Sequence, residues 1–104
     1  MQGLGSALWE GFQFSPDGRL LNPSFTDYKI PTAKDTPHEI VPIFIETPQP
    51  DGPYGARGVA EHPMISVPSA VGNALHDALG VDLFDLPLTA ERIERAIREK
   101  KAGT

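Results

Sequence analysis

The sequence predicts an α+β fold in one domain over residues 1–104, with an N-terminal helix, a short hairpin, an edge strand and two C-terminal helices. Three observations lead to this prediction. Apolar residues recur at helical spacing near both ends of the chain. Eight of the eleven prolines lie between Pro31 and Pro68, where they exclude a long helix. One continuous β-branched apolar run stands inside that proline-rich stretch.

The first elements are a helix and a hairpin. Leu4, Ala7, Leu8 and Phe12 are spaced by three and four residues, which predicts a helix in the first eleven residues. The pattern starts abruptly, without a preceding cap, and we expect an upstream partner for this helix. The run Ser15-Pro-Asp-Gly18 suits a type I turn and follows an alternating Phe-Gln-Phe, so a hairpin is predicted around it.

The middle of the chain contains the predicted strand and a glycine loop. Residues 39–46 are nearly all apolar and are bounded by Glu39 and Glu46. Pro42 removes one ladder donor, so the run is predicted to be an edge strand. In residues 52–61 glycine recurs at every third position, which favours a loop whose backbone takes positive φ or approaches a ligand closely.

Two helices are predicted at the C-terminus. In the first, Pro68 suits the first turn, Gly80 suits the end, and the apolar stripe is Val71, Leu75 and Leu79. In the second, Thr89 is the N-cap. Its buried stripe is Ile93, Ala96 and Ile97, with favourable i, i+4 charge pairs from Glu91 to Arg95 and from Glu94 to Arg98.

Composition excludes several functional classes. Nine basic residues against 14 acidic ones give a net charge of −5, whereas nucleic-acid binders usually carry a basic excess. Cysteine is absent, so this chain holds no disulfide, zinc–thiolate site or iron–sulfur cluster. No apolar run reaches the roughly 18 to 20 residues of a membrane span, and no signal peptide is visible. We expect no nucleic-acid or membrane partner and a cytoplasmic location.

Glu61 is the candidate catalytic residue. It ends the glycine loop and precedes His62-Pro63 and the apolar pair Met64-Ile65. A carboxylate between a flexible backbone and apolar neighbours can have its charged form disfavoured and so serve as a base. The alternative is an ordinary solvated glutamate. The three histidines do not fall at metal-ligand spacing, and no metal site is expected from this chain alone.

Four strings, in order along the chain, resemble the molybdenum hydroxylases, the family of xanthine dehydrogenase and aldehyde oxidoreductase. Gln2-Gly-Leu-Gly-Ser-Ala-Leu-Trp-Glu10 resembles the family's pterin-contacting Q-G-x-G segment. Residues 17–31 resemble its D-G-x-x-x-N-P-S-x-x-D-Y-x-x-P stretch. Residues 52–63 resemble its G-x-K-G-V-G-E-x-P loop. Pro87-Leu-Thr-Ala-Glu-Arg-Ile93 resembles its P-L-T-P-E-R helix start.

The resemblance implies roles for particular residues. Glu61 matches the family's general base, and Gln2 matches the glutamine that hydrogen-bonds the molybdopterin cofactor. The backbone of Gly58, Val59 and Ala60 would line the metal pocket. The implied function is hydroxylation of a heterocycle or an aldehyde by an oxidoreductase of which this chain is the C-terminal portion. The implied partners are the remainder of the molybdenum-binding large subunit, and iron–sulfur and FAD groups on partner subunits.

Two residues depart from the family pattern. Ala60 stands where the family usually has Gly, and Arg57 replaces the common Lys. Because only the C-terminal end of the subunit is covered, we expect a fragment of the molybdopterin-binding domain, a separately encoded part of a split subunit, or a frame opened at an internal Met. Such a chain should be inactive alone. Two alternatives are a stand-alone α+β interaction module without catalysis and an independent hydrolase that uses Glu61 and His62.

Overall fold

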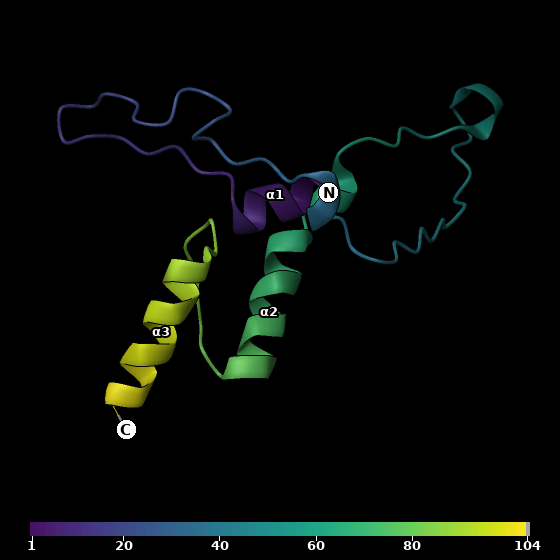
Figure 1. Cartoon of the computed structure of the whole chain (residues 1–104). Coiled ribbons are helices and arrows are strands. Elements are labelled where there is room, and N and C mark those ends of the chain that lie inside the picture. The colour runs from purple at the N-terminus through teal and green to yellow at the C-terminus, as the bar shows by residue number, and fades with distance from the viewer. Residues whose placement is uncertain (104) are drawn as a thin grey trace.

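The computed structural model of the chain describes residues 1–103. Its regular secondary structure consists mainly of three α-helices. They are α1 (Gln2–Leu8), α2 (Val67–Leu79) and α3 (Ala90–Ala102). Three short 3-10 turns lie between α1 and α2: η1 (Ala33–Asp35), η2 (Pro53–Gly55) and η3 (His62–Met64). In Figure 1, α1 lies across the upper end of α2, and two long loops leave this junction in opposite directions.

The junction of α1 with η3 and α2 depends on Gly3. Gly3, Gly5 and Ala7 are the buried residues of α1. A Cβ atom built on Gly3 would lie 2.7 Å from Cβ of Val67 and 3.1 Å from the carbonyl oxygen of Met64. Only a residue without a side chain allows this approach, so Gly3 sets how closely the start of α1 lies against the start of α2.

We predict that Gly3→Ala loosens this junction. Alanine adds up to about 1 kcal/mol of helix propensity, but the overpacking against Val67 costs roughly 1–3 kcal/mol. Amide hydrogen exchange across α1 should therefore become faster in the purified chain. Ser6→Ala, on the same helix, is the matched control and should leave exchange unchanged. Exchange in Gly3→Ala that is as slow as in the wild type would contradict the prediction.

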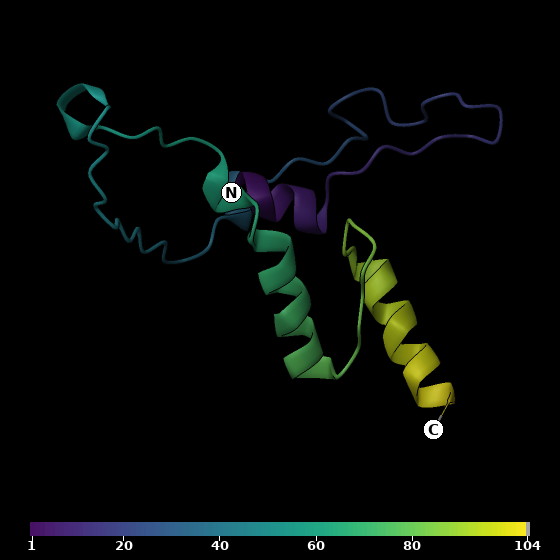
Figure 2. The same ribbon diagram turned by 180° about the vertical axis from the view of Figure 1, so that it is seen from behind.

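The C-terminal helices form as the sequence predicts. Gly80 follows α2 with a left-handed φ of 65°, and the side chain of Thr89 accepts a hydrogen bond from the backbone of Arg92 at the start of α3. The predicted pair of Glu94 and Arg98 is formed. Lys100 donates to the carbonyl oxygens of Leu79, at 3.1 Å, and Gly80, at 2.9 Å. This contact ties the end of α3 to the end of α2, and the two helices run side by side in the same direction (Figures 1 and 2).

The hairpin predicted around Ser15–Gly18 is reduced to its turn and a single bridge. The backbone N–H of Gly18 donates to the carbonyl of Ser15 at 2.9 Å, and Phe14 pairs with Leu20 in an isolated antiparallel bridge. Asn22 closes the loop from inside. Its side chain, in a residue only 5% exposed, accepts from the backbone N–H of Gln13 at 2.9 Å and donates to the carbonyl of Gly11 at 2.8 Å.

Asn22→Ala should open this loop. The substitution removes the side-chain partner of the partly buried Gln13 N–H and Gly11 carbonyl, and each lost hydrogen bond costs about 1 kcal/mol. Amide exchange in residues 11–22 should rise by about tenfold or more. Asn73→Ala, at an exposed position of α2, is the control. Unchanged exchange in the loop would contradict a structural role for Asn22.

The predicted edge strand at residues 39–46 is not confirmed. The structure assigns no strand to this segment, and none of its backbone N–H groups donates to another described backbone group. The physical reason is that a strand needs a neighbour, and no described strand lies beside it. Its apolar side chains stay in solvent: Ile43, Phe44 and Ile45 are 82%, 80% and 88% exposed. The β part of the predicted α+β fold therefore has no counterpart in residues 1–103 beyond the single bridge.

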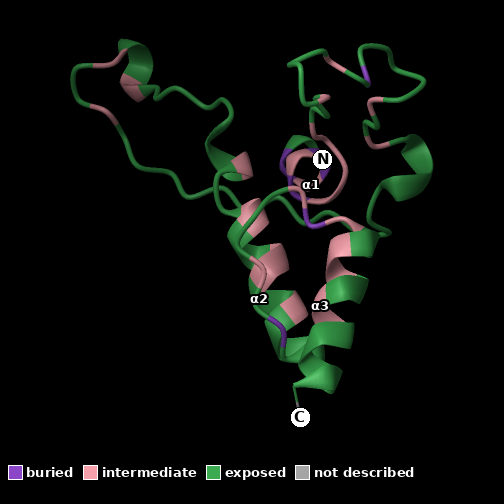
Figure 3. Cartoon of the chain, turned by 90° about the vertical axis from the view of Figure 1, so that its left-hand side faces the viewer, coloured by how far each residue is buried: buried purple, intermediate pink, exposed green. Residues whose placement is uncertain are grey.

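Little of the chain is buried. Its radius of gyration is 18.2 Å, against about 13 Å expected for a compact domain of this length. Its accessible surface is 8728 Å², against roughly 5700 Å² expected for a folded monomer of this mass. The buried apolar residues among those described are Ala7, Val81 and Leu88. Figure 3 shows buried residues in purple around α1 and, separately, at the lower end of α2, with both long loops mostly exposed.

The helical stripes are correspondingly shallow. Val71 and Leu75 in α2, and Ile93, Ala96 and Ile97 in α3, are half-buried, so the buried stripe predicted for α3 is only partly covered. None of the helices within residues 1–103 has the length and apolar character needed to cross a membrane.

Candidate active site

Gln2 and Glu61 lie together although 59 residues separate them. The side-chain amide Nε2 of Gln2 donates a hydrogen bond to Oε1 of Glu61 at 2.7 Å. Gln2 is the first residue of α1, and Glu61 directly precedes η3, which leads into α2. Both are exposed. The packing of α1 on η3 and α2 therefore brings the predicted cofactor contact and the predicted base into one site.

The backbone on both sides of this pair is held by local contacts. The N–H of Met64 donates to the carbonyl of Glu61 at 3.0 Å, which closes the turn that carries the carboxylate. On the other side, Gly3, the residue after Gln2, packs directly on Val67. The two side chains therefore project from segments whose separation is fixed by packing, and a direct hydrogen bond can form between them.

A cavity of about 250 Å³ lies next to the pair. It is lined by residues of α1, of the loop before η3, of η3 and of the start of α2: Met1, Gln2, Gly3, Ala60, Glu61, Pro63, Met64 and Val67. Most of these residues are apolar, and Gln2 and Glu61 contribute the polar side-chain atoms. A mostly apolar hollow with a few polar groups is the usual form of a small-molecule site.

The donor set at this cavity suits a cofactor with a hydrogen-bonding heterocyclic edge. A primary amide offers two N–H donors and one acceptor oxygen, and Gln2 uses one donor on Glu61. The remaining donor and the acceptor are available to a pterin-like ring. Oε2 of Glu61 accepts no hydrogen bond from residues 1–103 and can take up a proton.

The other predicted site residues, Gly58, Val59 and Ala60, do not all lie at this cavity. Ala60 lines the Gln2–Glu61 cavity, whereas Gly58 and Val59 do not. Val59 instead lines a separate hollow beside Phe44 and Ile45, and its side chain is 81% exposed. Ala60 has a negative backbone φ, since Tyr54 is the only non-glycine residue with positive φ within residues 1–103. The backbone at position 60 therefore does not require the glycine that is usual there.

Sequence reasoning missed the cavity walls formed by Met1, Gly3 and Val67. The sequence places the apolar Met64 close to Glu61, but no local pattern marks Val67 as a neighbour of the carboxylate. The contribution of these walls depends on helix packing, and the small residue Gly3 beside Gln2 is the signal in the sequence of a close approach. Partial burial raises the pKa of the Tyr28 phenol, and its hydrogen bond to Glu10 adds to this.

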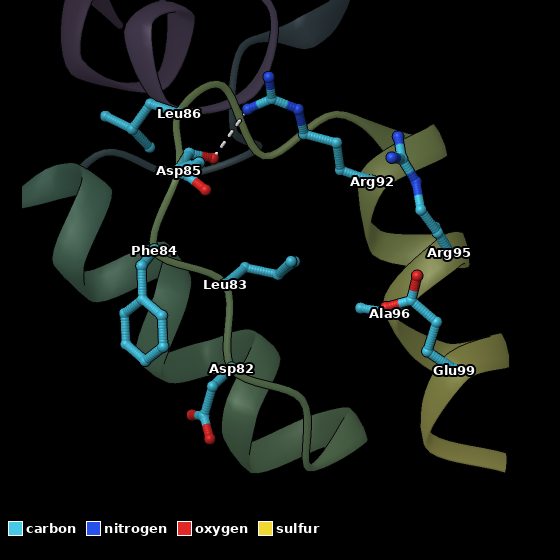
Figure 4. A pocket seen from close by; sticks show the side chains of 9 residues that line it. All are labelled: Asp82, Leu83, Phe84, Asp85, Leu86, Arg92, Arg95, Ala96 and Glu99. Atoms are coloured by element: carbon cyan, nitrogen blue, oxygen red, sulfur yellow. Dashed lines mark hydrogen bonds between the residues drawn. The ribbon is translucent and has the colours of Figure 1, made fainter. Parts of the chain in front are cut away.

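A larger hollow of about 610 Å³ lies between the loop 82–86 and α3 (Figure 4). It contains none of the predicted site residues. Arg92 donates to the carbonyl oxygens of Asp85, at 3.0 Å, and Pro87, at 3.1 Å, so its guanidinium holds the loop in place. Figure 4 shows the side chain turned toward that loop. This hollow therefore lies between α3 and the loop that connects it to α2, and its presence follows from the path of that loop.

The described histidines do not complete a catalytic group with Glu61. His62 follows Glu61 in η3 and is exposed. His76 is a surface residue whose Nδ1 lies 2.8 Å from Oδ1 of Asp82. Within residues 1–103, no three His, Asp or Glu side chains gather in a way that could hold a metal ion.

Residues 1–37 match the family described as the molybdopterin cofactor-binding domain. The chain is 40% identical over 102 residues to the nicotine 6-hydroxylase large subunit of Paenarthrobacter nicotinovorans, covering 94% of this chain and 12% of that protein. It is 35% identical over 98 residues to the aldehyde oxidoreductase of Megalodesulfovibrio gigas, covering 93% and 10%. The crystal structure of quinoline 2-oxidoreductase from Pseudomonas putida 86 superposes with a TM-score of 0.84 at 39% identity, over 94% of this chain and 13% of that one.

These similarities confirm the predicted resemblance and its molybdopterin cofactor. They extend over nearly the whole chain, which spans only about an eighth of the length of the curated relatives it matches. The chain therefore belongs to the molybdenum hydroxylase family of xanthine dehydrogenase and aldehyde oxidoreductase, as a segment of the large, molybdenum-binding subunit.

Proposed function

We propose that this chain supplies the general base, Glu61, and one cofactor contact, Gln2, to an oxidoreductase that hydroxylates a heterocycle or an aldehyde. The observation that carries the proposal is the 2.7 Å hydrogen bond between these two residues beside one cavity. The names of the relatives, which include a nicotine hydroxylase and an aldehyde oxidoreductase, support the substrate class.

The proposed division of labour follows from the atoms at the site. When bound, the molybdenum cofactor supplies the two-electron oxidation chemistry. Gln2 binds its pterin edge through the remaining amide N–H and the amide oxygen. Glu61 takes up a proton at Oε2 during the reaction, while Oε1 stays on Gln2. Pro63, Met64 and Val67 form apolar walls beside the carboxylate, and coverage of the cavity by the rest of the large subunit would exclude water there.

The backbone of Gly58, Val59 and Ala60 has a subsidiary place in the proposal. Ala60 already lines the cavity, and Gly58 has open space around it, since a Cβ built there would meet nothing within 4 Å. When the rest of the active site surrounds this loop, its backbone N–H groups would face the metal pocket. The methyl group of Ala60 would then narrow the pocket relative to a glycine.

The rest of the site is proposed to come from the remainder of the large subunit. The large accessible surface of the chain and its exposed apolar loop support this dependence. Iron–sulfur and FAD groups on partner subunits would carry the electrons away, since this chain has no cysteine to hold a cluster. By itself the chain should not turn over substrate, and we place the assembled enzyme in the cytoplasm.

The test is purification of the tagged chain from its native host, with elemental analysis of the product. Molybdenum and a large polypeptide in near-equal amounts with the chain would support the proposal. The polypeptide is identified by peptide sequencing as the remaining part of a molybdenum-binding subunit. A chain that elutes alone and without molybdenum would overturn it and would favour the non-catalytic interaction module.

A further inference from the structure

We propose that Gln2 positions Glu61 for proton transfer, in addition to any contact with the cofactor. This inference rests on the proposed function, because it assigns Gln2 a second task at the same site. It concerns the donor atom that faces Glu61, whereas a cofactor contact uses the other polar atoms of the same amide.

The geometry singles out one orientation of the carboxylate. The Gln2 Nε2–H holds Oε1, so rotation of the Glu61 side chain about its last bond is restricted. Oε2, without a partner among the described residues, is then the oxygen that accepts the proton. No other described side chain donates a hydrogen bond to Glu61, so loss of the Gln2 amide would free both oxygens.

The contact is fixed from both ends, which a chance surface hydrogen bond is not. Gln2 begins the helix whose next residue, Gly3, packs on Val67. Glu61 begins the turn closed by the 3.0 Å hydrogen bond from the Met64 N–H. Both backbones meet at the same junction of α1, η3 and α2, so the pairing orders no further backbone and costs only the rotamer freedom of the two side chains.

The same hydrogen bond gains strength when water is removed. In the chain as described, both side chains are exposed and the bond competes with water. Coverage of the cavity by the rest of the large subunit would exclude that water, and a charge-assisted hydrogen bond is stronger in a low-dielectric site. Gln2 therefore acts as a positioning residue mainly in the assembled enzyme.

The experiment compares four variants of the assembled enzyme: Gln2→Ala, Glu61→Gln, Glu61→Asp and the double variant Gln2→Ala/Glu61→Asp. In Gln2→Ala we expect kcat to fall by roughly 10- to 100-fold, KM to change less than about twofold, and molybdenum content per subunit to stay at the wild-type level. Gln13→Ala, an exposed glutamine in the hairpin loop, is the matched control and should behave as the wild type.

The double variant separates positioning from an independent effect. Aspartate keeps a carboxylate but withdraws it by one carbon, beyond the reach of Gln2. Adding Gln2→Ala to Glu61→Asp should then change kcat less than about twofold. The positioning role would be overturned if the double variant lost kcat by the product of the two single-variant factors. An unchanged kcat in Gln2→Ala, or a loss of molybdenum that accounts for its lower rate, would overturn it as well.

The controls also distinguish this inference from the proposed function. Wild-type turnover in Glu61→Gln would remove the general base itself, and the proposed function would fail with it. Loss of turnover in Glu61→Gln together with a normal kcat in Gln2→Ala would leave the base in place and overturn only the positioning role.

Discussion

Glu61→Gln in the assembled enzyme is expected to keep molybdenum and to lose turnover by about 100-fold or more. Glutamine matches the size of the glutamate, and its amide oxygen can still accept the hydrogen bond that Gln2 donates to Oε1. The Glu61 side chain lines the cavity, and a glutamine of the same size fills the same space. The packing of α1 on α2 runs through Gly3 and Val67 and does not involve the carboxylate, so the site should stay assembled. An amide cannot take up a proton at neutral pH, and the chemical step loses its base.

The measurement is kcat with any aldehyde or aromatic N-heterocycle that the wild-type complex oxidises, together with molybdenum per subunit. Glu46→Gln is the matched control, since Glu46 is an exposed glutamate in the same long loop and does not line the Gln2–Glu61 cavity. It should retain wild-type rates. Turnover in Glu61→Gln equal to that of Glu46→Gln would remove Glu61 from the chemistry.

The helices were predictable because their signals are local. Gly80 ends α2 in the left-handed conformation, and Thr89 caps α3 through the backbone of Arg92, as the sequence predicts from these residues alone. The spacing of Leu4, Ala7 and Leu8 likewise predicts α1. Its buried residues, however, are Gly3, Gly5 and Ala7, because α1 packs closely against its neighbours through small side chains.

The strand and the site depend on contacts that no local pattern contains. The composition of residues 39–46 favours β structure, but hydrogen bonds to a neighbouring strand are what make a strand. Similarly, the resemblance assigned Gln2 and Glu61 to one active site, yet their direct contact is closed by the approach of Gly3 to Val67, 64 residues further along the chain. Only the structure brings these segments together.

The exposed segment 40–45 carries the second large prediction: Phe44→Asp should block assembly with the rest of the large subunit. Ile43, Phe44 and Ile45 are each at least 80% exposed. A continuous apolar run of this kind is typical of a strand that is covered on both faces, which the rest of the large subunit would provide. Covering each such side chain stabilises the assembly by about 1.5–3 kcal/mol. A buried unpaired carboxylate instead costs several kcal/mol.

The fraction of chain that co-purifies with the large polypeptide should therefore drop by more than about tenfold in Phe44→Asp. Thr36→Asp adds the same charge at an exposed position before the segment, and it should assemble normally. The helical content of Phe44→Asp should match the wild type, because the segment makes no backbone hydrogen bond to α1, α2 or α3. Normal co-purification of Phe44→Asp would mean that the segment stays in solvent. If Phe44→Asp instead lowers self-association and leaves co-purification unchanged, the apolar run contacts a second copy of this chain. The same variant therefore distinguishes the two possible partners of the segment, the large polypeptide and another copy.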